Sequence, residues 1–280
     1  MQEQAPSRTA FAAAAHRAAH QVVEQGRIFP DPLALPILGL DPETLVQDAE
    51  ANPSRRGLRF FIAARSEFAE AMLRDAVETR GVGQLVVLGA GFDTFAYRSP
   101  FADRLRVFEV DHPATQAWKR RRLAEAGIAI PPLLTFAPVD FERDALLDRL
   151  TDCGFNPAQR SFFMWLGVVP YLTEEAITGT LGVIGGLPGG AEVAFDYADP
   201  PQTLSEEMRA LHEERAARVS ALGEPFLSYF EPGPLHDLLR RLGFRRIDDH
   251  NLPALAARYG VKPAKPLPER GGHVLFAATH

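Results

Sequence analysis

Short apolar runs that recur along the chain from residue 84 onward constrain its fold more than any other feature. Residues 84–89, 106–111, 133–140, 161–168 and 191–197 are rich in aliphatic, β-branched or aromatic side chains, which is typical of buried strands. Helix-compatible segments follow most of these runs, and such alternation predicts βαβ units, because parallel strands need long crossover connections. A helix that stops at Gly243, a further strand and a terminal strand in GGHVLFAATH complete the pattern. We therefore expect an α/β fold with a parallel sheet that is covered on both faces.

Two regions fall outside this alternation. Within residues 1–80, the stretches TAFAAAAHRAAHQVVEQ and LRFFIAARSEFAEAMLRDAVE carry apolar residues at helical spacing, and a proline-rich connection separates them. Residues 198–235 contain prolines and one charged helical segment. We expect residues 1–80 to form a helical cap on a core of residues 81–280, and residues 198–235 to form a lid inserted into that core. The whole chain is predicted to be one compact domain.

Charge and cysteine content argue against several classes of protein. The 280 residues carry a formal net charge of −6, which argues against a nucleic-acid partner, since such binding rests on clustered Lys and Arg. The basic run at residues 119–122 is predicted to be the solvated face of a helix. The single cysteine, Cys153, excludes a disulfide framework and a CxxC metal site, so we expect an ordinary thiol and no metal. No secretory signal or membrane span is recognisable, which predicts a cytoplasmic protein without a membrane partner.

The stretch VVLGAGFDTFAYR, at residues 86–98, is the most informative motif. A buried strand runs into Gly89 and Gly91, and glycines let the backbone turn sharply and approach a ligand closely. Asp111 ends the next predicted strand, about twenty residues later, where doubly wound folds place a carboxylate on ribose hydroxyls. Together these features predict a site for an adenosine-containing cofactor.

The spacing of the glycines distinguishes between two such cofactors. A dinucleotide fingerprint requires a third glycine, but the sequence continues Phe92, Asp93 and Thr94. A carboxylate in this turn would repel a pyrophosphate, whereas it suits a ligand with an amine and a sulfonium. The motif therefore favours S-adenosylmethionine over a nicotinamide cofactor, with an NAD(P)-dependent oxidoreductase as an alternative.

Six motifs in order, SRTA, FPDPLA, VVLGAGFDTFAYR, FEVDHP, PVDF and WLGVVPYLTEEAI, cover nearly the whole chain. In this arrangement the sequence resembles the leucine carboxyl methyltransferase family, and more closely its bacterial branch of S-adenosylmethionine-dependent O-methyltransferases. The resemblance implies a class I methyltransferase Rossmann-like fold with a helical N-terminal cap. It also implies a seven-stranded, mostly parallel sheet whose last strand is antiparallel.

The resemblance further implies roles for individual residues. The glycine turn would contact the methionine part of the donor, the acid of EVDHP its ribose, and the end of the third strand its adenine. An arginine before the first strand would bind the donor carboxylate. The matching residues are Gly89, Gly91 and Asp93 for the methionine, Asp111 for the ribose, Asp140 and Phe141 for the adenine, and Arg65 for the carboxylate.

One departure concerns the fourth strand. Eukaryotic relatives resemble EGV there, with a glutamate that contacts the donor, whereas this chain has Leu166, Gly167 and Val168. We keep Leu166 in the predicted donor site. The protein substrate of those relatives, however, is not expected for this chain.

Several of these residues also have purely structural interpretations. The two glycines could serve only the turn. Asp111 and Asp140 could cap the helices that follow them, and Arg65 could form an ordinary surface ion pair. His112 is predicted to have a local structural role, and Trp165 and Tyr171 to belong to the core or a pocket wall.

The sequence thus predicts a methyltransferase that uses S-adenosyl-L-methionine and releases S-adenosyl-L-homocysteine. We expect O-methylation of a small-molecule carboxylate or hydroxyl, in secondary metabolism, by in-line displacement. A carboxylate needs no general base, and no catalytic residue is assigned; Asp196, Tyr197, Asp199 and His212 are the side chains that could serve a hydroxyl. A non-catalytic protein that binds the donor is the second alternative. The acceptor, the atom methylated and the oligomeric state are not assigned.

Overall fold

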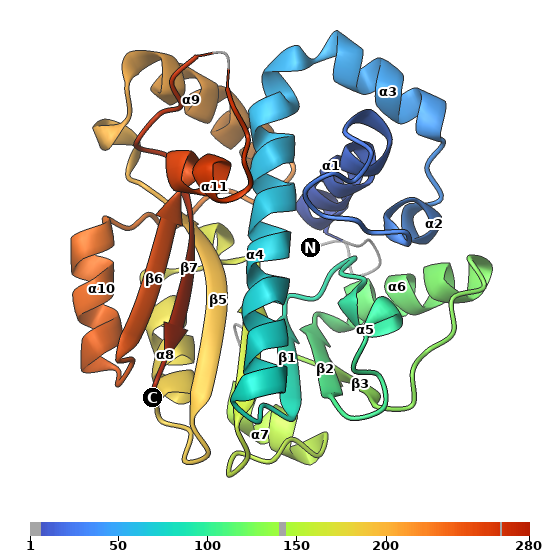
Figure 1. Ribbon diagram of the computed structural model, residues 1–280, viewed down its shortest axis with the longest axis vertical. Coiled ribbons are helices and arrows are strands. Elements are labelled where there is room, and N and C mark those ends of the chain that lie inside the picture. The colour runs from blue at the N-terminus through green and yellow to red at the C-terminus, as the bar shows by residue number, and fades with distance from the viewer. Residues whose placement is uncertain (1–6, 140–143, 264) are drawn as a thin grey trace.

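The computed structural model describes residues 7–139, 144–263 and 265–280, and a seven-stranded sheet lies at its centre (Figure 1). The order of the strands across the sheet is β3-β2-β1-β4-β5-β7-β6. Strands β1 to β5 run parallel, whereas β7 is antiparallel to both β5 and β6. The predicted sheet, mostly parallel with an antiparallel last strand, is thereby confirmed. The strands are β1 (Gln84–Leu88), β2 (Arg106–Asp111), β3 (Leu134–Pro138), β4 (Ser161–Trp165), β5 (Ala191–Ala198), β6 (Arg246–Asn251) and β7 (Gly272–Ala278).

The strand order reverses between β1 and β4. The chain moves outward from β1 to β3, then returns to pair β4 on the other side of β1. Because the five strands are parallel, the loops after β1, β2, β4 and β5 meet at one edge of the sheet. This edge, beside the reversal point, is where open α/β sheets bind ligands.

Alternating side chains of each strand explain why both faces of the sheet are covered. In β1, Leu85 and Val87 pack on one side and Val86 and Leu88 on the other. Every residue of β1 and β4 is buried, as expected for central parallel strands.

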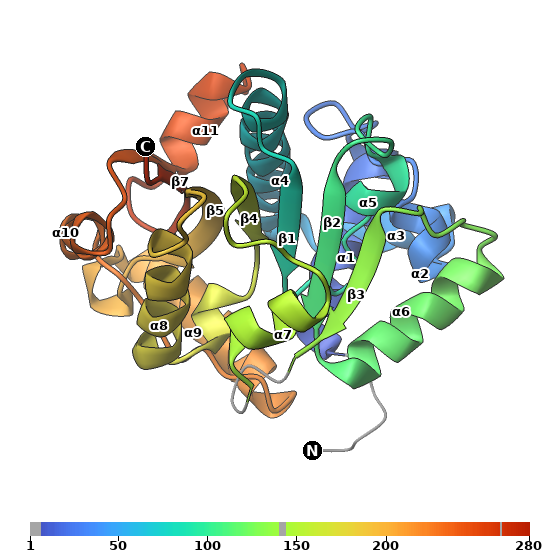
Figure 2. The same cartoon turned by 90° about the horizontal axis from the view of Figure 1, so that it is seen from below.

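Helices form a layer on each face (Figures 1 and 2). Helices α7 (Leu146–Asp152), α8 (Glu174–Gly185) and α10 (Pro232–Arg241) share one apolar cluster with the sheet. Helices α4 (Arg56–Thr79), α5 (Phe95–Arg98) and α11 (Leu252–Arg258) share the cluster on the opposite face. Phe68 and Leu73 of α4 are fully buried there, so this helix packs directly on the sheet.

The remaining helices of the first eighty residues gather at one side. Helices α1 (Arg8–Val23), α2 (Ala34–Leu38) and α3 (Pro42–Ala51) bury a third apolar cluster, to which α6 (Pro113–Glu125) contributes Leu123. A short turn of 3-10 helix, η1 (Pro53–Arg55), leads into α4. The chain before residue 80 is helical, as predicted, while the division into a cap and a core at that position stays a prediction.

The predicted lid contains one substantial helix, α9 (Glu206–Ala221), preceded by the 3-10 turn η3 (Pro201–Thr203). Ser205 caps α9, because its hydroxyl accepts a hydrogen bond from the backbone N–H of Met208. A third 3-10 turn, η2 (Val169–Tyr171), follows β4. Across the described ranges, no helix is long and apolar enough to cross a lipid bilayer.

The basic run at residues 119–122 differs from its prediction. Lys119 is only 1% exposed, and its Nζ lies 2.8 Å from Oε2 of the equally buried Glu109 on β2. The interpretation of this run as a solvated helix face is therefore wrong for Lys119. The error arises because a run of like charges does not show that one of its members points toward a buried carboxylate.

Candidate functional site

The glycine turn lies between β1 and α5. Gly89 has a φ of +63°, and a Cβ at this position would lie 2.4 Å from Cγ2 of Val168. Gly91 has a φ of +42°, and its Cβ would lie 3.3 Å from Cβ of Ala10 in α1. Both positions thus require glycine for the turn and for the close approach of neighbouring chain segments. Contact with a ligand is compatible with this geometry and stays a prediction.

Asp111 ends β2 next to this turn. Its Oδ2 accepts a hydrogen bond from the Gly91 N–H at 2.5 Å, and its Oδ1 accepts one from the His112 N–H at 2.7 Å. Burial raises the pKa of Asp111, and these two bonds oppose the shift. Because an ionised carboxylate can accept about four hydrogen bonds, Asp111 keeps capacity for further donors.

The residue that caps α6 is His112 rather than Asp111. The His112 Nδ1 accepts a hydrogen bond from the Ala114 N–H at 3.2 Å, and Pro113 occupies the first helical position. The predicted structural role of His112 is confirmed, and it leaves the carboxylate of Asp111 directed at the glycine turn.

Asp93 lies in the second half of the same turn. Its Oδ1 accepts a hydrogen bond from the Phe95 N–H at 2.8 Å, which orders the entry into α5. This contact gives Asp93 a structural role, and its predicted contact with a donor stays a prediction.

Arg65 reaches the same edge of the sheet from α4. Its Nη1 donates to Oδ2 of Asp196, on β5, at 2.5 Å, and the pair is buried. The interpretation as a surface ion pair is therefore wrong. Nε of Arg65 is also buried and has no hydrogen-bond partner among the described residues. This N–H is a donor that the protein alone leaves unsatisfied, which is costly in a buried position.

The segment after β4 completes this part of the site. Gly167 has a φ of +74°, and a Cβ there would lie 2.7 Å from Nη2 of Arg65, so glycine makes room for the guanidinium. The Gly167 N–H donates to Oδ1 of Asp196. Leu166 is half-buried and packs against the apolar cluster beneath α4. Position 166 carries no carboxylate in this chain. The carboxylate of Asp196 lies next to this segment instead, because it contacts both Gly167 and Arg65.

Asp140 and Phe141, predicted to meet the adenine, lie outside the described residues. Their predicted role is neither supported nor opposed by the structure.

The four side chains considered as general bases do not converge on one point. Asp196 pairs with Arg65. The Tyr197 hydroxyl donates to Oδ2 of Asp249 at 2.5 Å, and Asp199 is held by His273, Arg270 and the N–H of Gly271. Nε2 of His212 lies 2.9 Å from the Tyr229 hydroxyl, and both residues belong to the predicted lid. Among the described residues, Asp196 is the one of these four that contacts a residue of the predicted donor site, Arg65.

The sequence reasoning missed a buried aspartate that fixes the glycine turn. Asp31, in FPDPLA, is 1% exposed, lies 2.8 Å from Nε of Arg17 and accepts a hydrogen bond from the Thr94 hydroxyl at 2.7 Å. Arg98, one turn after Thr94, pairs with both Asp31 and Glu70 of α4. The available signal was a single acid between two prolines in an apolar stretch. An aspartate buried in such a stretch needs polar partners elsewhere in the chain.

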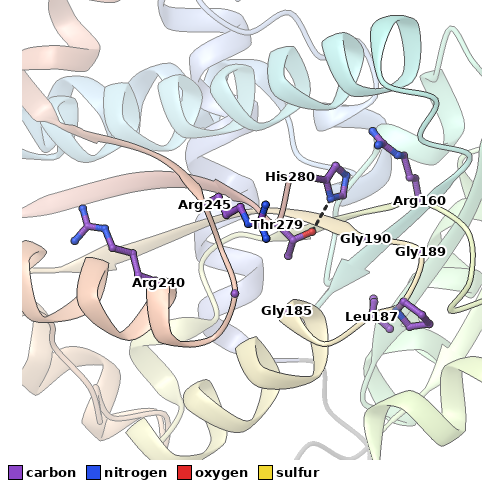
Figure 3. Close-up of a pocket in the computed structure, with 11 residues that line it drawn as sticks. Arg160, Gly185, Leu187, Gly189, Gly190, Arg240, Arg245, Thr279 and His280 are labelled. Carbon is purple, nitrogen blue, oxygen red and sulfur yellow. Dashed lines mark hydrogen bonds between the residues drawn. The ribbon is translucent and has the colours of Figure 1, made fainter.

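A hollow of about 540 Å³ lies elsewhere, between Arg160, Arg240, Arg245 and His280 (Figure 3). Arg160 directly precedes β4, Arg245 directly precedes β6, His280 lies two residues after β7, and Arg240 lies on α10. They therefore line the edge of the sheet opposite to the glycine turn, which separates this hollow from the candidate site. No cluster of His, Cys, Asp or Glu in the described ranges is arranged to hold a metal ion.

Comparison with known proteins identifies the family to which the chain is similar. A family model described as "Leucine carboxyl methyltransferase" matches residues 10–185. "Putative S-adenosyl-L-methionine-dependent methyltransferase YktD" of Bacillus subtilis is 37% identical over 182 residues, which are 64% of this chain and 59% of that protein. A Mycobacterium avium protein with the same name, apart from the gene symbol, is 31% identical over 259 residues, which are 88% of this chain and 84% of that protein. The match thus spans less than two thirds of the Bacillus protein and most of the Mycobacterium protein.

Solved structures with low sequence identity share the fold. The CurJ carbon methyltransferase superposes with a TM-score of 0.52 at 14% identity, covering 95% of this chain and 67% of that one. A DUF574 family protein from Streptomyces avermitilis gives 0.56 at 13% identity, covering 95% and 97%. Together with the strand order, these similarities confirm the predicted class I methyltransferase fold.

Proposed function

Because the chain belongs to the leucine carboxyl methyltransferase family, we propose that it is an S-adenosylmethionine-dependent methyltransferase that acts on an oxygen atom of a small molecule. Family membership supports the donor and the type of reaction. The oxygen acceptor and its small size are the additional content of the proposal.

The observation that carries the proposal is the unsatisfied Nε of Arg65 at the edge of the sheet where Asp111 ends β2. S-adenosylmethionine presents a carboxylate and a ribose diol, and these groups match a guanidinium donor and a carboxylate acceptor respectively. Arg65 would hold the carboxylate, and Asp111 would accept hydrogen bonds from the ribose. Gly89 and Gly91 lie in the turn that Asp111 contacts, and neither contributes a side chain to it.

When bound, the donor supplies a methyl group that its sulfonium activates for in-line displacement. The protein's own contribution is to orient the acceptor and to exclude water, which can account for much of a rate enhancement. A carboxylate acceptor needs no base, while a hydroxyl acceptor does. Burial lowers the pKa of His212, one of the four side chains that could serve a hydroxyl acceptor, and no general base is assigned among them.

Isothermal titration of the purified protein with S-adenosylhomocysteine tests the donor assignment, with NAD and NADP as controls. We expect saturable micromolar binding of S-adenosylhomocysteine alone. Binding of a nicotinamide cofactor, or of none of the three, would contradict the proposal.

A screen with labelled S-adenosylmethionine then tests catalysis. Transfer of label to an oxygen atom of small carboxylates or alcohols is the expected result, identified by mass spectrometry of the product. Donor binding without turnover on any acceptor would instead favour a non-catalytic binding protein.

A further inference from the structure

The hollow at the edge of the sheet opposite to the glycine turn has no role in the proposed function (Figure 3). Its volume of about 540 Å³ falls within the range of sites that take small molecules. Arg160, Arg240, Arg245 and His280 lie around it, and none of the described residues that line it is acidic. In Figure 3, Arg245 and His280 lie between Arg160 on one side and Arg240 on the other. The hollow thus brings several basic groups together in one concave place.

Two of these arginines have no carboxylate partner in the described ranges. Arg245 directly precedes β6, and its guanidinium forms no hydrogen bond or ion pair with the described residues. Arg160 directly precedes β4, and its Nη1 donates to a neutral group, the carbonyl of Arg80, at 3.1 Å. Because a guanidinium carries five N–H donors, most donors of both side chains stay available to a ligand.

The third arginine is held by a weak partner. Arg240, in the last turn of α10, donates from Nη1 to Oδ1 of Asp237 at 2.8 Å. The two side chains are 61% and 64% exposed, and an ion pair in such a position contributes little to stability. Arg240 also suits the carbonyl end of its helix, which attracts a cation. It can therefore exchange Asp237 for a ligand at little cost in free energy.

Glycine backbone and the residues after β7 form another wall of the hollow. Gly190 directly precedes β5 with a φ of +80°, and a Cβ there would lie 2.0 Å from Cε1 of His280. The imidazole lies against this glycine because no side chain is in its way. Oγ1 of Thr279 lies 2.8 Å from Nδ1 of His280 and accepts a hydrogen bond from the Ala191 N–H at 3.1 Å. These contacts fix the wall to the start of β5 before a ligand binds, which lowers the cost of binding.

The charges around His280 give the hollow a positive potential. Partial desolvation lowers the pKa of His280, and the charges of Arg160, Arg80 and Arg245 lower it further, against the opposing charge of Glu192. The effect of Arg160 alone is larger than that of Glu192, which is itself paired with Arg80. The cations therefore outweigh the acid at this place, and a concave region of positive potential attracts anions.

We propose that this hollow binds a small molecule that carries two or more phosphate groups, at a site separate from the predicted donor site. Phosphate oxygens match guanidinium N–H groups through paired, charge-assisted hydrogen bonds, and three arginines can engage more than one phosphate. A single carboxylate would leave at least one of the two unpaired arginines without a partner. The net charge of −6 makes the rest of the molecule acidic, which favours a small anion over a nucleic acid as the ligand.

Isothermal titration of the full chain with inorganic pyrophosphate and with orthophosphate, at constant ionic strength, tests this inference. We expect saturable binding of pyrophosphate that is at least tenfold tighter than that of orthophosphate. Arg245→Gln should weaken pyrophosphate binding at least tenfold, and Arg245→Lys, which keeps the charge but not the fork of donors, should weaken it less. Arg241→Gln is the matched control, because Arg241 is exposed beside Arg240 and does not line the hollow. This control removes the same charge and should bind pyrophosphate like the wild-type protein.

No saturable binding of pyrophosphate, equal affinity for the two probes, or equal losses in Arg245→Gln and Arg241→Gln would each overturn the inference. Competition between pyrophosphate and S-adenosylhomocysteine would also overturn it, because pyrophosphate would then occupy the donor site. Titration of S-adenosylhomocysteine alone reports separately on the proposed function. The two proposals can therefore fail independently.

Discussion

At the scale of single residues, Asp111 offers the sharpest test of the donor site. Its carboxylate already accepts two backbone hydrogen bonds and keeps capacity for the two ribose hydroxyls. We expect Asp111→Ala to weaken S-adenosylhomocysteine binding at least tenfold, about 1.4 kcal/mol, in calorimetry. Asp111→Asn preserves the shape and one acceptor oxygen, so its loss should be smaller. Unchanged affinity in a folded Asp111→Ala protein would remove Asp111 from the donor site.

The buried pair of Lys119 and Glu109 is a second test at this scale. Burial raises the pKa of Glu109 to about 7, and Lys119 opposes that shift. Lys119→Met should lower the free energy of unfolding by about 3–5 kcal/mol at pH 8, because it leaves an ionised carboxylate buried without its partner. The loss should shrink at pH 5, where Glu109 can take up a proton. Urea denaturation measures both values, and a double variant with Glu109→Leu should recover most of the loss; no recovery would contradict this account.

At the scale of elements, Glu224 joins the predicted lid to the start of α1. The bonds it accepts join segments more than 200 residues apart, so they hold two elements together rather than one turn. Hydrogen bonds to a charged group contribute about 1.5–3 kcal/mol each, so Glu224→Ala should speed amide exchange in α9 and in residues 7–12 about tenfold or more. Hydrogen exchange followed by mass spectrometry measures this effect.

The control for the lid is Glu214→Ala on the same helix. Glu214 forms only an exposed pair with Arg218, and such pairs contribute little to stability. Exchange in residues 7–12 should therefore stay at the wild-type rate. Equal acceleration in both variants would show that α9 simply unravels and that Glu224 has no special role.

At the scale of the whole molecule, stability should fall on acidification through groups in the helical prefix. Burial lowers the pKa of His16 from 6.5 to about 4, so the unfolded chain binds more protons than the folded one between these values. The free energy of unfolding therefore rises with pH between about 4 and 6.5 through this group. His16→Gln should flatten that part of the profile, as measured by denaturation at several pH values. An equally steep profile in the variant would contradict the assignment.

Other groups act at different pH values. Hydrogen bonds from His20 and Arg59 lower the pKa of Glu24 to about 2 against the opposing effect of burial, and its stabilisation is lost only as pH falls from about 4.5 to 2. Burial raises the pKa of Glu70 to about 7, which has the opposite sign and lowers stability as pH rises from about 4.5 to 7. The effect of His16 is therefore obtained by subtracting the free energy of unfolding of His16→Gln from that of the wild-type protein at each pH. The wild-type profile alone combines the contributions of all three groups.

The sequence by itself determined the sheet, the glycine turn and the position of Asp111. Each depends on neighbouring residues: apolar runs form the strands, Gly89 and Gly91 form the turn, and Asp111 ends its own strand. Such features are readable because strands and turns are built from local backbone preferences and from alternating side chains. The helices of residues 1–80 and of residues 206–221 were recognisable for the same reason, while the roles of cap and lid stay predictions.

Only the tertiary structure decided which distant side chains meet. Arg65 and Asp196 are 131 positions apart, and Thr94 is 63 positions from Asp31. From the sequence, Lys119 is indistinguishable from its charged neighbours, and only the packing of α6 on the sheet places it against Glu109. The partner of a buried charge is set by how whole elements pack, and that packing depends on the summed burial of many residues rather than on any local pattern.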